Sequence, residues 1–253
     1  MLVMELRKAR ILITGGTTGV GAALVGALHQ AGSIVVTSGR DRERCATLRS
    51  RHPGLHVVEI DLAGSGAGRR LVREAIEILG GLDVVINNAA IQVHERFVPV
   101  PAEGIDDRIA GEIALNLAAP IEITAAAMPA LIDSNAAALV YVTSGLAVFP
   151  KQTAPVYCAT KSALRTFAAA LRYQSSEEAA HLTVIDAVLP LVDTPMTAGR
   201  GSADAKMSPE AVAKQIVDAI VRSRPTVYVG KARLLPWLVR IAPSVGRRAL
   251  RDG

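Results

Sequence analysis

Short apolar runs alternate with longer stretches in which apolar residues recur at helical spacing. The apolar runs predict buried strands at residues 9–14, 34–38, 55–60, 83–86, 138–143, 182–189 and 226–229. The longer stretches predict helices at residues 22–30, 42–51, 68–79 and 155–178, and Ser208-Pro209-Glu210 is typical of a helix start. Because strands that alternate with helices form parallel sheets covered on both faces, the pattern predicts one doubly wound α/β domain with seven parallel strands.

A glycine-rich turn follows the first predicted strand. Gly15, Gly19 and Gly21 in G-G-T-T-G-V-G allow the backbone to approach an anion closely, and the next helix presents unpaired N–H groups at its start. A strand before this turn and a helix after it indicate the pyrophosphate site of a dinucleotide. We expect Thr17, Thr18 and Val20 to contact the cofactor as well.

The second predicted strand ends in Gly39-Arg40, without the acidic residue that would hold the ribose hydroxyls of NAD. A guanidinium there favours the 2'-phosphate of NADP, and Arg42 or Arg44 could share this contact. The alternative is that Arg40 is an exposed residue at the start of the next helix. We therefore expect NADP(H) as the cofactor.

The segment V-T-S-G-L-A-V-F-P-K-Q-T-A-P-V-Y-C-A-T-K-S-A, residues 142–163, carries the candidate chemistry. Ser144 ends a predicted strand, and Tyr157 and Lys161 stand one turn apart on the following helix. A phenol titrates near pH 10, so it is a poor proton donor or base at neutral pH unless a nearby cation stabilises its phenolate. We expect Lys161 to be that cation.

These motifs resemble those of the short-chain dehydrogenase/reductase (SDR) family. The resemblance rests on Ser144 with Tyr-x-x-x-Lys thirteen residues later, and on T-G-x-x-x-G-x-G in place of the more widespread G-x-G-x-x-G. It covers nearly the whole chain and implies a Rossmann-type domain at residues 1–230. Within the family, R-I-L-I-T-G-G-T-T-G-V-G, N-N-A-A-I-Q and L-P-L-V-D-T-P-M look most like the DltE-type oxidoreductases.

The resemblance also implies roles for single residues. Asn116 would complete a tetrad with Ser144, Tyr157 and Lys161 by connecting Lys161 to solvent through a water. Further cofactor contacts would come from Asp61 and Leu62, from Asn88, Ala89 and Ala90, and from Pro190, Val192 and Thr194. Two positions depart from the family, since Ala90 stands where N-N-A-G has glycine and Leu191 where Pro-Gly has glycine.

The expected reaction is the reversible reduction of a ketone or aldehyde to an alcohol by NADPH. Ser144 and Tyr157 would hydrogen-bond the carbonyl oxygen, and Tyr157 would donate the proton. One alternative is a cofactor-binding redox-sensing or regulatory protein of the same fold, and another is an NAD-dependent alcohol dehydrogenase. An epimerase or dehydratase is a weaker alternative, because the chain leaves little room for a sugar-nucleotide domain.

Mostly apolar residues are candidates for the substrate pocket, which favours a small hydrophobic carbonyl or alcohol substrate. Residues 190–208, rich in small side chains, are expected to form a loop over it. The candidate pocket residues are Gln92, Val93, Phe97, Leu146, Phe149, Leu191 and Met196.

The net charge of +5 comes from the end of the chain. From Arg222 onward there are eight basic residues and one acidic residue, against twenty and twenty-two before it. Residues 231–253 therefore form a basic amphipathic tail with an apolar stripe. We expect it to pack on the domain or on a partner subunit; contact with a membrane surface through Trp237 is not favoured, and nucleic acid is not expected.

The composition of the chain bears on its domain count, its cysteines and its cellular compartment. A chain of 253 residues that is 50% hydrophobic can bury one sizeable core. Cys45 and Cys158 have no metal-type spacing, so we expect two free thiols and no metal. Because we recognise neither an apolar run long enough to span a bilayer nor room for a signal peptide, we expect a cytoplasmic protein, as a homodimer or homotetramer.

Overall fold

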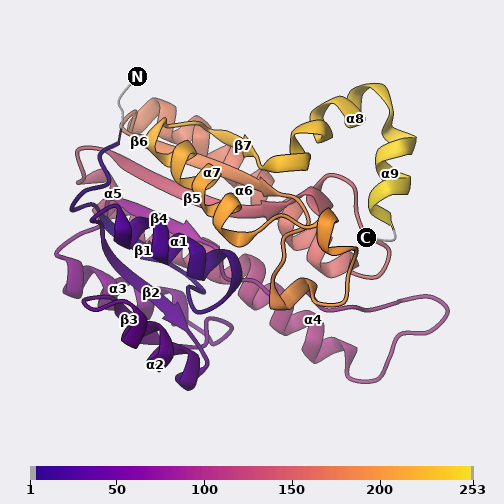
Figure 1. The fold of residues 1–253 in the computed structure, drawn as a ribbon, viewed down its shortest axis with the longest axis horizontal. Helices are drawn as coiled ribbons and strands as arrows, with labels where there is room; N and C mark the ends of the chain where they lie inside the picture. The colour runs from indigo at the N-terminus through magenta and orange to yellow at the C-terminus, as the bar shows by residue number, and fades with distance from the viewer. Residues whose placement is uncertain (1–3, 252–253) are drawn as a thin grey trace.

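The computed structural model describes residues 4–251; residues 1–3 and 252–253, at the two ends of the predicted domain and tail, lie outside the described residues. Its centre is a sheet of seven parallel strands with helices on both faces (Figure 1). The order across the sheet is β3-β2-β1-β4-β5-β6-β7, so the predicted doubly wound fold is confirmed. The strands are β1 Arg10–Ile13, β2 Ile34–Gly39, β3 His56–Glu59, β4 Val84–Asn87, β5 Ala137–Ser144, β6 Leu182–Leu189 and β7 Thr226–Tyr228.

The helices divide between the two faces. α1 (Gly19–Gln30), α2 (Arg42–Arg51) and α7 (Pro209–Val221) bury their apolar residues in the core on one face. The core on the other face contains residues from α3 (Ala67–Leu79), α5 (Ala119–Ile132) and α6 (Pro155–Glu178). Two covered faces explain why the strands read as continuous apolar runs rather than alternating ones.

The central strands place the chemistry at one edge of the sheet. β5 is buried along all eight of its residues because it pairs with β4 on one side and β6 on the other. Its last residue, Ser144, therefore emerges at the carboxyl edge. The strand order reverses between β1 and β4, and the crevice at such a point is where doubly wound sheets bind their ligands.

One long helical stretch lies on the second face. α4 (Ile105–Ile113) continues through a π-helical turn, Ala114–Ala118, into α5. Among the described residues this helix, Ile105–Ile132, is long and apolar enough to cross a membrane by length and composition, which the sequence analysis did not expect. However, Leu115, Ile123 and Leu131 pack in the core against α3 and the sheet, as residues of a core helix do.

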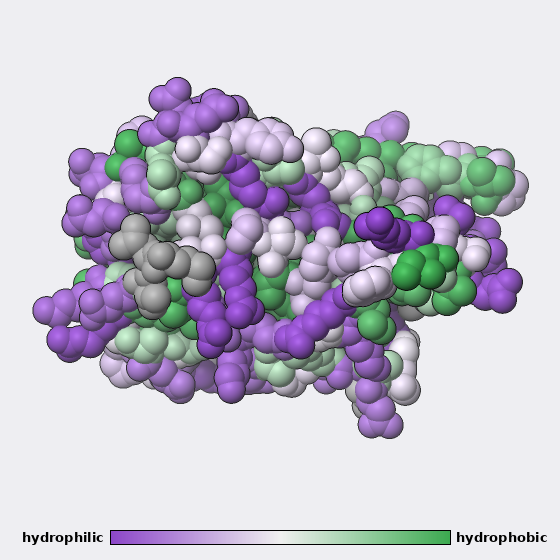
Figure 2. All heavy atoms as spheres, turned by 90° about the horizontal axis from the view of Figure 1, so that it is seen from above, coloured by the Kyte–Doolittle hydropathy of each residue, from purple (hydrophilic) through white to green (hydrophobic). Residues whose placement is uncertain are grey.

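The basic tail folds as a turn, Gly230–Leu234, followed by α8 (Leu235–Ile241) and α9 (Pro243–Arg251). Leu235 is buried against Phe149, and Leu238 and Leu250 pack at the edge of the same cluster. By contrast, Trp237 and Ile241 are 66% and 70% exposed. Apolar residues are visible at the end of the molecule where the tail lies (Figure 2). One side of the tail thus packs on the domain, while the other faces outward.

Deleting residues 234–253 is expected to lower the melting temperature. The deletion removes Leu235 and Gly246, whose backbone lies against the Phe149 ring, and so uncovers an aromatic side chain that is 4% exposed. Uncovering it costs about 2 kcal/mol, or roughly 4 to 8 °C in a domain of this size. Thermal melting measures the shift, with the exposed Trp237→Ser as control. A truncated protein that melts like the full chain but no longer binds anionic vesicles would favour the membrane interpretation.

Candidate active site

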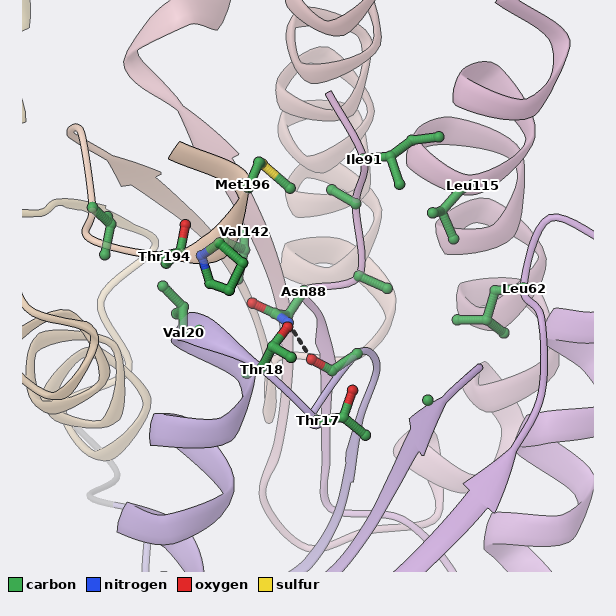
Figure 3. Close-up of a pocket in the computed structure, with 18 of the residues that line it drawn as sticks. Thr17, Thr18, Val20, Leu62, Asn88, Ile91, Leu115, Val142, Thr194 and Met196 are labelled. Atoms are coloured by element: carbon green, nitrogen blue, oxygen red, sulfur yellow. Dashed lines mark hydrogen bonds between the residues drawn. The ribbon is translucent and has the colours of Figure 1, made fainter. Parts of the chain in front are cut away.

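A cleft opens at the carboxyl edge of the sheet, between the ends of β1, β2 and β4 on one side and β5 and β6 on the other, with a volume of about 420 Å³. Val20 and Thr194 lie along one side of it, and Leu62, Leu115 and Ile91 along the other (Figure 3). The cleft is lined by all the residues that the sequence analysis assigned to the cofactor. These are Gly15, Thr17, Thr18, Gly19, Val20, Gly21, Arg40, Asp61, Leu62, Asn88, Ala89, Ala90, Tyr157, Lys161, Pro190, Val192 and Thr194.

The glycine turn forms a cradle for an anion. A Cβ at Gly21 would overlap the carbonyl oxygen of Gly15 and would lie 2.6 Å from the side-chain nitrogen of Asn88. Thr18 occupies the N-cap of α1, but its side chain makes no capping hydrogen bond, and the first turn holds no acidic residue. The N–H groups at the start of α1 are therefore left without a side-chain acceptor, as a pyrophosphate site requires.

The segment after β4 holds this cradle in place. The side-chain nitrogen of Asn88 donates to the carbonyl oxygens of Thr14, at 2.9 Å, and Gly15, at 3.2 Å. In return, the Thr14 hydroxyl oxygen accepts the backbone N–H groups of Asn88 and Ala89, both at 2.9 Å. The loops after β1 and β4 thus form one rigid wall of the cleft.

The end of β2 gives the cleft a basic rim. Gly39, Arg40, Asp41 and Arg44 line it. A Cβ at Gly39 would overlap the Thr17 methyl group, so this position has no room for a side chain. The Asp41 carboxylate caps α2 by accepting the Arg44 N–H at 3.0 Å, and it lies 3.4 Å from the Arg44 guanidinium. Since Asp41 is paired in this way, Arg40 adds a positive charge to the rim.

Ser144, Tyr157 and Lys161 meet at the inner end of the cleft. Tyr157 and Lys161 are 8% and 2% exposed on the same face of α6. The Lys161 ammonium group donates to the carbonyl oxygen of Val142 at 2.8 Å, and its nitrogen lies 5.8 Å from the centre of the Tyr157 ring. The Ser144 hydroxyl oxygen accepts the N–H of Leu146 at 3.1 Å, which fixes its rotamer.

Burial dominates the titration of both α6 side chains. It raises the pKa of Tyr157 to about 12, while the hydrogen bond with Ser144 and the charge of Arg200 act to lower that pKa. Burial also lowers the pKa of Lys161 to about 8, against the opposite pull of the Asp186 and Glu112 carboxylates. The Lys161 nitrogen lies beside the ring, but burial is the largest cause that sets the pKa of Tyr157. Tyr157 is therefore a neutral phenol that can donate a proton.

Asn116 lies on the π-helical turn rather than in the cleft lining. Its side-chain oxygen accepts the N–H of Ile91 at 2.9 Å, and its side-chain nitrogen donates to the carbonyl oxygen of Ile91 at 2.8 Å. This pair of hydrogen bonds fixes the segment after β4. A π-helical turn inside an α-helix is often found at a functional site, and this one aims an amide at the backbone instead of at its own helix.

Glu112, which the sequence analysis did not single out, lies one turn before Asn116. It is 1% exposed and accepts the N–H of Val93 at 3.1 Å. Burial is the largest cause that raises its pKa, and its charge raises the pKa values of Tyr157 and Lys161. An acidic residue one turn before an asparagine, among the apolar residues 113–118, was the signal that could have identified it.

The predicted substrate pocket is only partly assembled by the fold. Met196 lines the cleft, and the side chain of Gln92 reaches the loop after β6. Phe97 is 41% exposed, and Phe149 is buried under the tail instead. Leu191 packs at Gly201 in the loop after β6. Cleft residues that the sequence analysis did not assign include Ser38, Ile60, Ile91, Leu115, Pro195 and Thr197.

Comparisons with known proteins agree with this geometry. The family model for short chain dehydrogenases matches residues 9–205. The uncharacterized oxidoreductase DltE of Bacillus subtilis (strain 168) is 37% identical over 191 residues, which cover 76% of this chain and 74% of that protein. A short chain dehydrogenase of Burkholderia cenocepacia J2315, solved in complex with NADP, superposes with a TM-score of 0.78 at 25% identity, covering 91% and 100% of the two chains.

A third similar protein has a different cofactor bound. The 3-ketoacyl-(acyl-carrier-protein) reductase of Brucella melitensis, solved with NADH, superposes with a TM-score of 0.76 at 20% identity, covering 87% of this chain and 95% of that one. At this identity, the likeness shows the fold alone. The family match and the DltE relative carry the assignment. This chain belongs to the short-chain dehydrogenase/reductase family and, within it, to the DltE-type oxidoreductases.

Proposed function

We propose that this oxidoreductase uses NADPH to interconvert a ketone or aldehyde and the corresponding alcohol. The observation that carries the proposal is the position of Ser144, Tyr157 and Lys161 together at the inner end of the dinucleotide cleft. The bound nicotinamide cofactor supplies the hydride. The protein must then bind the carbonyl oxygen, stabilise the charge that develops on it and deliver one proton.

Ser144 and Tyr157 are suited to the carbonyl oxygen. Both hydroxyl groups reach the same point, as their mutual hydrogen bond indicates, and both can donate to an oxygen that becomes an alkoxide. Because the pKa of Tyr157 is raised to about 12, its proton is present at neutral pH. The alkoxide is the stronger base and takes that proton, and the Lys161 ammonium group beside the ring stabilises the phenolate that remains.

NADPH rather than NADH is proposed on the basis of the rim at the end of β2. Arg40 adds a positive charge there, and Gly39 has no space for the carboxylate that would bind ribose hydroxyls. The nearby Asp41 carboxylate is used in capping α2 and pairing with Arg44. A guanidinium matches the planar fork geometry of a phosphate.

The direct test is NADPH oxidation by the purified protein with a panel of aldehydes, ketones, oxo acids and quinones. Oxidation of NADPH with formation of the alcohol supports the proposal. Cofactor binding without turnover of any member of the panel would point instead to a redox-sensing protein of the same fold.

Arg40→Gln is expected to reduce the preference for NADPH over NADH, measured as the ratio of the two kcat/KM values, by about tenfold to hundredfold. This range corresponds to one charge-assisted hydrogen bond of about 1.5 to 3 kcal/mol. The control is Arg42→Gln. Arg42 is the first residue of α2 and lies outside the cleft lining. A wild-type protein that prefers NADH, or an unchanged ratio in Arg40→Gln, would contradict this assignment.

We also propose a cellular compartment and an oligomeric state for the enzyme. Cys45 and Cys158 are free and buried, as expected for a reducing compartment, and we place the enzyme in the cytoplasm as a homodimer or homotetramer. Fractionation and light scattering test these two points. A membrane-bound pool or a monomer would contradict them.

A further inference from the structure

Arg200 lies on the loop after β6, of which Met196 and Thr197 line the cleft. Its Nη1 donates to the side-chain oxygen of Gln92, and its Nη2 forms a hydrogen bond with Nε2 of His94. Gln92 and His94 belong to the segment after β4, more than one hundred positions earlier in the chain. The guanidinium therefore bridges the two segments that flank the substrate side of the site.

The loop that carries Arg200 is closed at its base. Val192 pairs with Met207 in an isolated bridge, and the N–H of Asp193 donates to the carbonyl oxygen of Met207 at 2.9 Å. The Lys206 ammonium group donates to the carbonyl oxygen of Thr197 at 2.9 Å. These contacts give the loop a defined shape and hold Arg200 in a fixed position.

Leu191 packs against the turn that follows Arg200. A Cβ at Gly201 would lie 3.0 Å from a methyl carbon of Leu191, so the leucine fills the space under the turn that follows Arg200. Gly201 has a φ of 59°, a conformation that suits glycine at this close approach. The leucine that departs from the family pattern thus packs under the turn that presents the guanidinium.

The charge of Arg200 has no acidic partner within the described residues. Arg10, Arg108 and Arg165 form ion pairs with Asp83, Glu95 and Asp186, whereas Arg200 forms none there. Both of its hydrogen-bond partners are neutral, because burial and the charges of Arg200 and Lys151 lower the pKa of His94 below its ordinary 6.5. Two neutral acceptors leave the full positive charge and further N–H groups available.

Arg200 also lies within electrostatic reach of the catalytic hydroxyl group. Burial is the larger cause for both groups, raising the pKa of Tyr157 and lowering that of Arg200, and the charge of each group acts on the pKa of the other in the opposite direction. Within the part of the chain that the structure describes, the buried side-chain nitrogen of Gln92 has no hydrogen-bond partner, so a donor beside Arg200 is left unsatisfied. An anionic group of a ligand that pairs with the Arg200 guanidinium would therefore lie close to the carbonyl oxygen held by Tyr157.

We infer that Arg200 binds a carboxylate of the substrate, so that the enzyme reduces oxo acids in which the carboxylate lies close to the reacting carbonyl. This inference rests on the proposed carbonyl reduction. A planar guanidinium binds a carboxylate through two parallel hydrogen bonds, and a single positive charge between neutral partners matches a single negative charge. The apolar residues of the cleft, Met196 and Ile91, are left for the body of the substrate.

The test compares an oxo acid with its neutral methyl ester. Phenylglyoxylate and benzoylacetate, each beside its methyl ester, place the carboxylate at two distances from the carbonyl. We expect the wild type to favour one or both acids over the ester by about tenfold to hundredfold in kcat/KM, the range of one charge-assisted hydrogen bond. Arg200→Gln should remove that preference, and Arg200→Lys should keep part of it because the charge remains.

Arg96→Gln is the matched control. Arg96 is an exposed arginine on the segment after β4, so its loss should leave the ratio of acid to ester unchanged. Fluorescence titration with NADPH verifies that each variant still binds the cofactor. Equal use of acid and ester by the wild type, or a ratio that Arg200→Gln does not change, overturns the inference.

Calorimetry separates failure of this inference from failure of the proposed function. If the panel shows no carbonyl reduction, the proposed function fails. Titration of phenylglyoxylate and its ester into the protein with NADP then decides the role of Arg200 without turnover. Tighter binding of the acid that is lost in Arg200→Gln supports the carboxylate site, and equal binding of acid and ester overturns it.

Discussion

Tyr157→Phe is expected to lower kcat for carbonyl reduction by about 100-fold to 10,000-fold and to leave the affinity for NADPH unchanged. The substitution removes the hydroxyl group that donates the proton, but it keeps the ring, which is 8% exposed on α6. Since burial holds the pKa of Tyr157 at about 12, the hydroxyl is protonated at neutral pH and its loss removes the donor itself.

Single-turnover kinetics with NADPH and a fluorescence titration of the cofactor measure the two effects separately. The control is Tyr173→Phe, because Tyr173 stands on the same helix but is 72% exposed. It should leave both quantities unchanged. A Tyr157→Phe variant that keeps more than about a tenth of the wild-type rate would contradict the assigned role, since general acid catalysis contributes at least 100-fold.

The fold and the cofactor cleft follow closely from local sequence signals. Apolar runs identified all seven strands, with bounds that shifted by at most one residue at either end, because most strand residues are buried and each strand ends at a turn. The glycines at 15, 19 and 21 identified the anion cradle because a side chain at Gly21 would overlap the loop itself. Such constraints act within a few residues, so a single sequence carries them.

The substrate side depends on contacts between distant segments, which no local pattern contains. Arg200 meets Gln92 and His94 across more than one hundred positions, and its only signal was a basic residue in a loop rich in small residues. Phe149 was predicted in the pocket wall, yet the packing of the tail at Gly246 and Leu235 buries it elsewhere. Tertiary packing, rather than the local sequence around Phe149, decides where its ring lies.

The electrostatics of the site also depend on burial depth. The spacing of Tyr157 and Lys161 on one helix face suggested that the ammonium group lowers the pKa of the phenol. In the structure, burial outweighs charge for both groups, raising the pKa of one to about 12 and lowering that of the other to about 8. Desolvation of this size depends on every element packed around α6, which the motif alone does not describe.

Lys161→Met is expected to abolish turnover and to stabilise the protein at neutral pH by about 2 kcal/mol. Burial lowers the pKa of Lys161 from 10.5 to about 8, and each pKa unit corresponds to about 1.36 kcal/mol, so the protonated form costs the fold roughly 3 kcal/mol. The lost hydrogen bond to the carbonyl oxygen of Val142 offsets about 1 kcal/mol of this gain. Methionine has a similar length and no charge to bury.

The pH dependence of the difference in stability between wild type and Lys161→Met separates the charge of Lys161 from the other effects of the substitution. A group whose pKa is lowered on folding binds more protons in the unfolded state between pH 8 and pH 10.5, so wild-type stability from this group rises with pH in that window. The stability advantage of Lys161→Met should therefore shrink by about 2 kcal/mol from pH 7 to pH 9.5. Urea unfolding of both proteins across this range measures the difference. Lys214→Met, at an exposed site on α7, should show no such trend. An advantage that stays constant with pH would show that Lys161 does not carry a buried charge.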